Sequence, residues 1–109
     1  MRWGVGTARH SVVAEAKFDP LIHAPHRLRI CAIAHATTHV EFRELQERLG
    51  ISKSALSKHI AQLVGYGYLR EEHRTRGGHS RLRLSLTEPG RRAYRGHIAA
   101  LKEIIEAAE

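Results

Sequence analysis

Two helical patterns follow one another with almost no gap between residues 41 and 66. In the first pattern, which ends at Gly50, the apolar residues Phe42, Leu45 and Leu49 recur at the spacing of one helix face. Glycine is a typical residue just beyond a helix C-terminus, because it adopts the left-handed conformation without strain. The pattern therefore predicts a helix that ends in a tight turn.

The second pattern, about 52–66, has one apolar and one polar side. Ser52 is suited to cap its first turn. The side that we expect to be buried consists of Leu56, Ile60, Leu63 and Val64. The other side carries mainly short or flexible hydrogen-bonding side chains: Ser54, Ser57, Lys58, Ala61 and Gln62. Such a row on one helix face can meet base edges and phosphates in a DNA major groove.

A broken helix is predicted before these two, over residues 19–36. Asp19 is a good N-cap and Pro20 suits the first helical position. Pro25 interrupts the pattern, so we expect a single short turn followed by a main helix that starts near this proline. The expected buried side of the main helix consists of Leu28, Ile30, Cys31 and Ile33.

A β-hairpin is predicted over residues 68–87, preceded in the chain by a short extended segment at 38–42 with Val40 inward. In the second hairpin strand three leucines alternate with polar residues: Leu82, Leu84 and Leu86. Gly77 and Gly78 mark the turn, around which three arginines gather: Arg74, Arg76 and Arg81. A small basic tip fits a DNA minor groove, although charges on a hairpin also serve to discourage edge pairing.

The C-terminal segment predicts a long helix that Thr87 caps. Its apolar residues are spaced by four, three, four and three positions: Tyr94, Ile98, Leu101, Ile105 and Ala108. This coiled-coil-like stripe either folds onto its own core or packs on a partner helix. Since the other elements already cover a core of this size, the stripe favours a homodimer interface that includes Tyr94, Ile98, Leu101 and Ile105.

Composition narrows the class of partner. The chain has 109 residues, of which 42% are hydrophobic but only 6% aromatic, so we expect one small domain with an aliphatic core. The net charge is +7 and the pI is about 10.3, which favours a polyanion: nucleic acid or an anionic membrane. No apolar run approaches the roughly 20 residues of a membrane span, and the N-terminus lacks the apolar core of a secretory signal. We therefore expect a cytoplasmic protein.

The order of predicted elements is helix, short strand, helix, tight turn, helix, basic hairpin and helix. Two helices joined by a tight turn and followed by a hairpin form the winged helix-turn-helix pattern. The expected fold is mainly α with a small β-hairpin. We divide the chain into an N-terminal tail at 1–17, a DNA-binding domain at 18–87 and a dimerisation helix at 88–109. Within the tail, residues 1–10 are expected to be mobile, and residues 11–18 to include a short helix.

The stretches "FDPLIHAPHRLRICAI", "ELQERLGISKSALSKHIAQLVGYGYL" and "RLRLSLTEPGRRAY" resemble the MarR/ArsR-type winged-helix transcriptional regulators, in particular their short single-domain MarR-like type. The resemblance covers about residues 18–95. It implies a homodimer that binds a roughly two-fold double-stranded DNA operator. It also implies a recognition helix that supplies Ser52, Lys53, Ser54, Ser57 and Lys58, and a wing at about 74–81 that supplies Arg74, Arg76 and Arg81. This chain departs from the family pattern at Gly65-Tyr66 and in its Gly-Gly-His wing tip.

Several alternatives stay open. Lys53 and Lys58 could be ordinary solvated residues. Two histidine pairs near Cys31, His23 with His26 and His35 with His39, raise a metal-responsive or redox-responsive sensor, but no dense cysteine and histidine box appears. A winged helix can also bind protein or RNA. We find no nucleophile–base pair, phosphate loop or paired carboxylates, so we expect neither an enzyme nor a cofactor.

Further expectations concern a possible effector site and three single residues. A small-molecule effector could bind between the DNA-binding domain and the dimer helices, near Tyr94 and Ile98. We expect His59 to pack or to face phosphate. Arg83 is expected to cover the hairpin or to pair with Glu71 or Glu72. A lone cysteine such as Cys31 forms no intramolecular disulfide, as is usual in a reducing cytosol.

Overall fold

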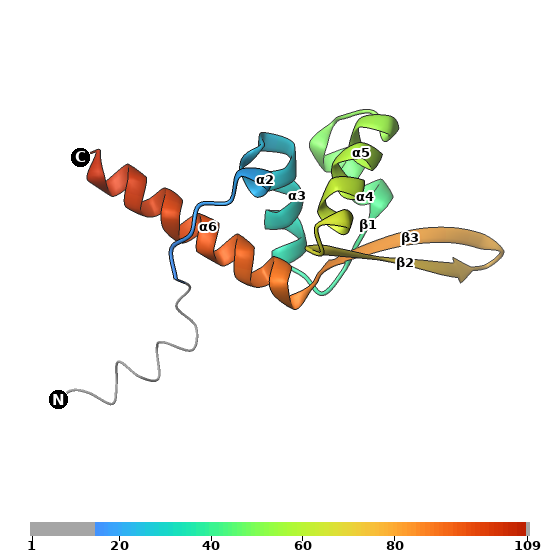
Figure 1. Cartoon of the computed structure of the whole chain (residues 1–109). Coiled ribbons are helices and arrows are strands. Elements are labelled where there is room, and N and C mark those ends of the chain that lie inside the picture. The colour runs from blue at the N-terminus through green and yellow to red at the C-terminus, as the bar shows by residue number, and fades with distance from the viewer. Residues whose placement is uncertain (1–14, 109) are drawn as a thin grey trace.

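The computed structural model describes residues 15–108. Its elements are α2 (Pro20–His23), α3 (Pro25–His35), β1 (Val40–Glu41), α4 (Phe42–Leu49), α5 (Lys53–Gly65), β2 (Leu69–Arg76), β3 (His79–Leu86) and α6 (Glu88–Ala107). The hairpin of β2 and β3 projects from one side of the helical body, and the C-terminal end of α6 projects from the other (Figure 1). This arrangement gives an elongated outline of 59 × 31 × 22 Å. The predicted winged helix-turn-helix fold, mainly α with a small sheet, is confirmed.

Local capping signals begin three of the helices where the sequence predicts. Asp19 Oδ1 accepts hydrogen bonds from the backbone N–H groups of the two residues that open α2 after Pro20. Ser52 Oγ accepts from Ala55 N at 3.1 Å, and Thr87 Oγ1 accepts from Gly90 N at 3.0 Å. Each cap satisfies an otherwise unpaired donor and stabilises the chain by about 1 kcal/mol.

The N-terminal region partly differs from expectation. The predicted break at Pro25 is present, because α2 ends at His23 and Ala24 is extended before α3 begins. The short helix predicted within 11–18 is wrong for its described part: residues 15–18 form no helix and lie against α6, where Lys17 N donates to Gly96 O at 2.9 Å. Residues 11–14, like the tail 1–10, lie outside the described part of the chain.

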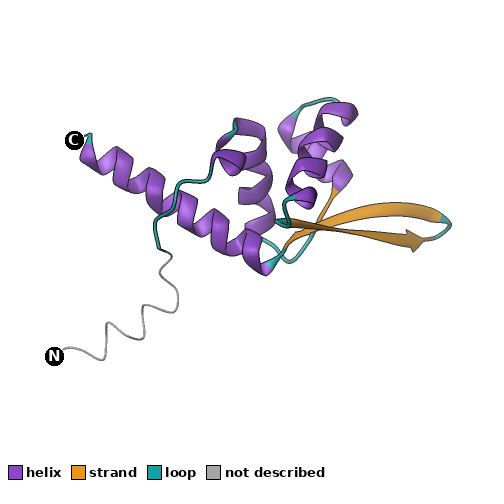
Figure 2. Cartoon of the chain, viewed as in Figure 1, coloured by secondary structure: helices purple, strands orange, loops and turns teal. Residues whose placement is uncertain are grey.

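The sheet consists of three antiparallel strands in the order β1-β3-β2 (Figure 2). Val40 pairs with Leu84 and Leu69 pairs with Leu86, so the inner end of the sheet turns apolar side chains toward the helices. Val40, Leu69, Leu84 and Leu86 are all buried. The outer part of the hairpin extends beyond this contact, and its described side chains there are exposed.

The core is aliphatic, as the composition predicts. Its largest fully buried side chains include Ile22, Ile30, Leu45, Leu56, Ile60, Leu63 and Leu84. Two residues expected on the buried side of α3, Leu28 and Ile33, are only partly buried at the core margin, while Ala34 lies fully inside. Cys31 is also buried, and burial raises the pKa of its thiol to about 12, so the reactive thiolate is scarce at neutral pH.

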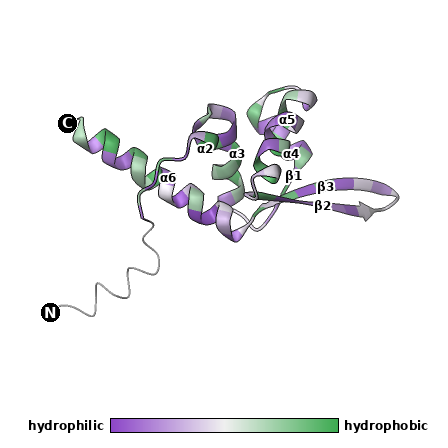
Figure 3. Cartoon of the chain, in the orientation of Figure 1, coloured by the Kyte–Doolittle hydropathy of each residue, from purple (hydrophilic) through white to green (hydrophobic). Residues whose placement is uncertain are grey.

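Helix α6 has two different halves. Its first half packs on the domain through small or buried residues that include Gly90, Gly96, His97 and Ala100. Its C-terminal half continues past the domain, and green and purple positions alternate along it (Figure 3). Ile104 and Ile105 are 55% and 61% exposed there. An apolar surface of this kind on a projecting helix is unusual for a chain on its own.

A polar cluster joins α6 to the N-terminal segment and the start of the hairpin. His97 is fully buried, its Nδ1 accepts from Asp19 N at 2.9 Å, and its Nε2 lies 3.2 Å from His23 Nδ1. Tyr68 donates its hydroxyl to Asp19 Oδ2 at 2.6 Å. The Phe18 ring packs against both imidazoles at 4.8 Å between ring centroids. The hydrophobic pattern of the sequence does not predict this polar cluster.

Candidate nucleic-acid interface

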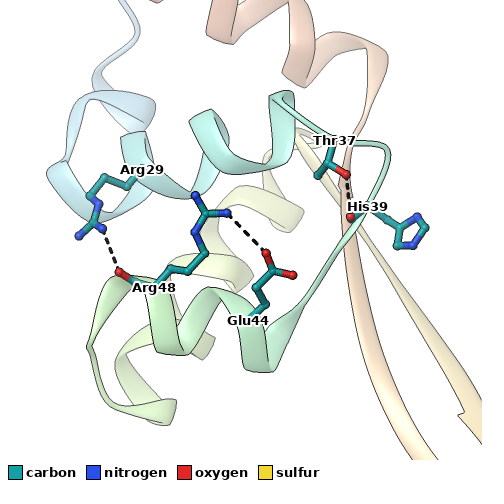
Figure 4. Close-up of polar contacts among 5 residues, drawn as sticks. All are labelled: Arg29, Thr37, His39, Glu44 and Arg48. Atoms are coloured by element: carbon teal, nitrogen blue, oxygen red, sulfur yellow. Dashed lines mark hydrogen bonds and ion pairs between the residues drawn. The ribbon is translucent and has the colours of Figure 1, made fainter.

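Helices α4 and α5 form the helix-turn-helix, and the turn between them is fixed from both sides. Gly50 adopts φ +66°, the left-handed conformation that ends α4. Arg29 on α3 donates to the backbone carbonyl of Arg48 at 2.9 Å, and Arg48 in turn pairs with Glu44 one helical turn away (Figure 4). The last turn of α4 is therefore held against α3, which positions the start of α5.

The five residues predicted for the recognition helix lie together on the surface at the start of α5. All are exposed, and together they line a shallow open hollow on the surface of the first turns of α5: Ser52, Lys53, Ser54, Ser57 and Lys58. Leu56, Ile60 and Leu63 occupy the opposite, buried face. The helix thus presents hydroxyls and ammonium groups outward from a firmly packed base.

A groove of about 570 Å³ separates this helix from the wing. Lys53 and Ser57 form its α5 side, and the hairpin residues His79–Leu82 form its other side. Arg43, at the start of α4, also lines it. Two cationic residues, Lys53 and Arg81, were predicted for DNA contact; Arg43 and His79 were missed. No periodic signal marks them, because only the packing of α4 against the hairpin brings them together.

Carboxylates restrain the wing arginines. Arg81 Nη1 lies 3.1 Å from Glu41 Oε1, and Arg74 Nη1 lies 3.5 Å from Glu72 Oε2. Arg83 donates to Glu72 at 2.8 Å, which confirms the predicted pairing. This hydrogen bond, together with the charges of Arg83 and Arg74, lowers the pKa of Glu72. The described wing is therefore less positive than its arginines alone suggest.

Arg76, the third predicted wing arginine, pairs through its backbone with His79 at the hairpin end. Its side chain lies outside the described part of the structure. The turn itself has the predicted residues, since Gly77 and Gly78 both adopt positive φ values of 57° and 82°.

The histidines do not assemble as the metal hypothesis requires. His23 faces His97, whereas His26 packs beside His59 with 5.5 Å between ring centroids. His35 stacks on Tyr94, and His39 contacts Arg83. Within residues 15–108, no three His, Cys, Asp or Glu side chains are grouped so that they could hold a metal ion.

His59 packs, as one of its two predicted roles requires. Arg27 Nη1 donates both to His59 Nδ1 at 3.2 Å and to Gln62 Oε1 at 2.9 Å, while Arg27 Nε donates to the carbonyl of Leu21 at 2.6 Å. These contacts lie on the flank of α5 that faces α2 and α3. The helix is thus held on one flank by Arg27 and bordered on the other by the groove.

The four residues of the predicted dimer stripe have different surroundings in the single chain. Tyr94 packs at the margin of its own core and beside His35, Ile98 and Leu101 are partly buried, and Ile105 is largely exposed. Ile104, which the predicted spacing leaves out, is exposed next to Ile105. The exposed apolar surface of α6 is therefore centred nearer the C-terminus than the predicted stripe.

The helix-turn-helix, the three-stranded sheet and the hairpin that follows α5 define a winged helix protein. Residues 26–105 match the family described as winged helix DNA-binding domain, and the chain belongs to this family. No curated protein sequence matches the chain. None of the helices between residues 15 and 108 is long and apolar enough to cross a membrane.

Several solved structures share the fold. A transcriptional regulator homologue from Pyrococcus horikoshii OT3 superposes with a TM-score of 0.76 at 20% identity, over 82% of this chain and 88% of that chain. HlyU from Vibrio cholerae N16961 gives 0.59 at 22% identity, over 91% and 97%. ZitR from Lactococcus lactis, a zinc-responsive MarR family member, gives 0.62 at 17% identity, over 95% and 75%.

Proposed function

We propose that the protein is a sequence-specific transcriptional regulator that binds double-stranded DNA as a homodimer. One observation carries the proposal: the exposed Ser and Lys face of α5 lies beside a groove whose walls include Lys53, Arg43 and Arg81. A firmly packed helix with outward hydroxyls and ammonium groups suits the DNA major groove. The family match and the solved neighbour from Pyrococcus horikoshii, a transcriptional regulator homologue, support the same function.

The proposed binding mode follows from the geometry of the site. The face of α5 enters the major groove, the phosphate backbone runs along the groove between α5 and the wing, and the hairpin tip reaches the adjacent minor groove. Phosphate contacts fix the register, and the side chains of Ser54, Ser57 and Lys58 read or approach base edges. The cytoplasm is the compartment that this role implies.

The homodimer rests on the projecting half of α6. Two copies that pair through Ile104, Ile105 and the neighbouring apolar residues would place two recognition helices about a two-fold axis. Half-sites would then be centred about 34–36 Å apart, so that both helices enter successive major grooves on one side of the duplex.

A salt-titrated binding measurement on duplex DNA from upstream of the chain's own gene, with random duplex as competitor, tests the function. We expect preferential binding whose affinity falls steeply with salt, because Lys and Arg contacts release counterions. Equal, weak binding to both duplexes across all salt concentrations would contradict the proposal. Binding of RNA or of a protein instead of DNA would show that the winged helix has a different class of partner.

Lys58→Ala tests the assigned face. If Lys58 contacts a phosphate, the variant should reduce the slope of log affinity against log salt by about 0.9. Lys102→Ala removes the same charge from an exposed position on α6 and serves as the matched control. Identical slopes for the two variants would remove Lys58 from the interface.

A further inference from the structure

On the flank of α5 opposite the wing, the Arg27 guanidinium makes the hydrogen bonds that join this helix to α2 and α3, beside the packing of His26 on His59. Arg27 Nε donates to the carbonyl of Leu21 in α2, and Arg27 Nη1 donates to His59 and Gln62 on α5. Arginine offers a rigid planar set of donors, so these bonds fix both the distance and the angle between α2, α3 and α5. A side chain with a single donor nitrogen cannot reproduce this geometry.

The contact also fixes the proton on His59. Arginine has no acceptor, so His59 Nδ1 must carry a lone pair toward Arg27, and the ring is neutral with its proton on Nε2. Burial lowers the pKa of His59, and so do the nearby charges of Arg27 and His26 on α3 and of Lys58 on α5; the hydrogen bond with Gln62 opposes them. Protonation at Nδ1 would put two N–H groups face to face.

We infer that Arg27 is a positioning residue for DNA recognition, which holds the recognition helix in its reading orientation through His59 and Gln62 as long as the His59 ring is neutral. This inference rests on the proposed function. Base readout depends on the orientation of α5, whereas phosphate attraction depends mainly on charge. Loosening α5 should therefore reduce discrimination between operator and random DNA far more than total DNA affinity.

Two substitutions separate geometry from charge. Arg27→Lys keeps the positive charge and Arg27→Met removes it, but both lose the shared contact with His59 and Gln62. Each should weaken operator binding about tenfold, the effect expected when the fraction of molecules with α5 in its reading orientation falls to about a tenth. Binding to random duplex and the salt slope should stay close to those of the unmodified protein. Arg92→Met, which removes an exposed arginine from α6, is the matched control.

If Arg27→Lys binds the operator normally while Arg27→Met lowers the salt slope by about 0.9, then Arg27 is a phosphate contact and the positioning role is wrong. Thermal unfolding of each variant shows whether lost discrimination merely reflects lost folding.

The pH dependence gives a second test. The pKa of His59 is lowered from the ordinary histidine value of about 6.5, so the ring gains its second proton only at a pH below that value. Operator discrimination should fall as the pH is lowered through the acid range in which the protein stays folded, because protonated His59 repels Arg27. His59→Asn keeps an acceptor near the Nδ1 position and does not titrate, so its discrimination should stay constant with pH. A wild-type ratio that does not change with pH would overturn the role of His59.

A measurement without DNA keeps this inference separate from the proposed function. Amide hydrogen exchange in α5 should be faster in Arg27→Met than in Arg92→Met, because the helix has lost its lateral contact. If the unmodified protein shows no operator preference but this difference is present, the proposed function fails while Arg27 still positions α5. Unchanged exchange in α5 would overturn the positioning role itself.

Discussion

His97 is a polar side chain buried on the packed half of α6, and its hydrogen bonds decide its protonation state. Because Asp19 N–H points at Nδ1, the His97 proton lies on Nε2 and is donated to His23. Burial, and then the charge on His23, lowers the pKa of His97, while Asp19 opposes this shift. The neutral ring links α6 to the segment that precedes α2.

Substituting His97 should separate the loss of the hydrogen bond from the loss of bulk. His97→Leu leaves Asp19 N–H unpaired and should lower the free energy of unfolding by about 1–3 kcal/mol. His97→Asn keeps an acceptor near the Nδ1 position, so it should lower the free energy of unfolding by less than His97→Leu does. Chemical denaturation at neutral pH measures both, and equal stabilities of the two variants would contradict the role of Nδ1.

The same substitution changes the dependence of stability on pH. The folded pKa of His97 lies below its unfolded value of about 6.5, so below that pH the unfolded state takes up the proton first and the free energy of unfolding falls as pH falls. Well above pH 6.5, His97 is neutral in both states and does not change the free energy of unfolding with pH. His97→Asn should have a shallower acid slope, with a remainder from His35 and His59, whose pKa values are also lowered.

Gly90 is required for a close approach between backbones. A Cβ at this position would overlap the carbonyl oxygen of Tyr68. Gly90→Ala should therefore destabilise the chain by several kcal/mol and lower its melting temperature, as overpacking against backbone does. Gly65→Ala, at the end of α5 with nothing within 4 Å, is the control and should be neutral or slightly stabilising. Similar melting temperatures for both variants would contradict this packing.

At the scale of elements, an ion pair joins β1 to the wing. The carboxylate of Glu41, the last residue of β1, lies 3.1 Å from Arg81 of β3, so an arginine that faces the groove is already partly neutralised. Such an exposed pair contributes little to stability, about 0–1 kcal/mol. Its main effect is therefore on the affinity of the groove for phosphate.

Glu41→Gln should strengthen DNA binding severalfold and steepen the salt dependence, because Arg81 becomes available to a phosphate. Glu44→Gln removes the same charge from α4 but frees Arg48, which lies away from the wing groove. Fluorescence anisotropy at several salt concentrations compares the two. An identical gain in both variants would show that only net charge matters.

The elements themselves could be predicted because their signals are local. A cap such as Ser52 or Thr87 depends on a partner three residues away, and the turns at Gly50 and Gly77-Gly78 depend on single backbone conformations. The expected helix within 11–18 failed because residues 15–18 pair with α6 instead, at Gly96. Gly96 is far from residues 15–18 in the sequence, and a contact between such distant positions produces no periodic pattern within the segment.

The candidate site divides in the same way. Ser54, Ser57 and Lys58 share the outward face of α5 because helix geometry places them there, and Ser52 and Lys53 join them because they lie at the exposed start of the helix. Arg43 and His79 enter the site through the packing of α4 on the hairpin, and Glu41 meets Arg81 across 40 positions of sequence. Neither relation could be predicted from residue spacing.

At the scale of the whole molecule, the exposed isoleucines of α6 are the strongest indication of a second copy. Ile105→Glu should shift the protein to a monomer without unfolding it, since the side chain is already largely exposed in the single chain. Glu103→Lys alters a charge on the opposite side of α6 and should leave the mass unchanged. Light scattering coupled to size-exclusion chromatography measures both, and an unchanged dimer for Ile105→Glu would refute this interface.

Tyr68 lies where the wing and α6 both begin. Its carbonyl accepts the backbone N–H of Thr87 at 3.0 Å and covers Gly90, while its hydroxyl reaches Asp19. The wing and the projecting half of α6 leave the body on opposite sides (Figure 1). If two copies pair through α6 as proposed, a small rotation between the two helices would displace the wing tips by a larger distance, because the wing and the paired end lie far from the body on opposite sides. The contacts that hold the first half of α6 on the domain, at Tyr68 and at His97, would then limit how much the spacing between half-sites can vary.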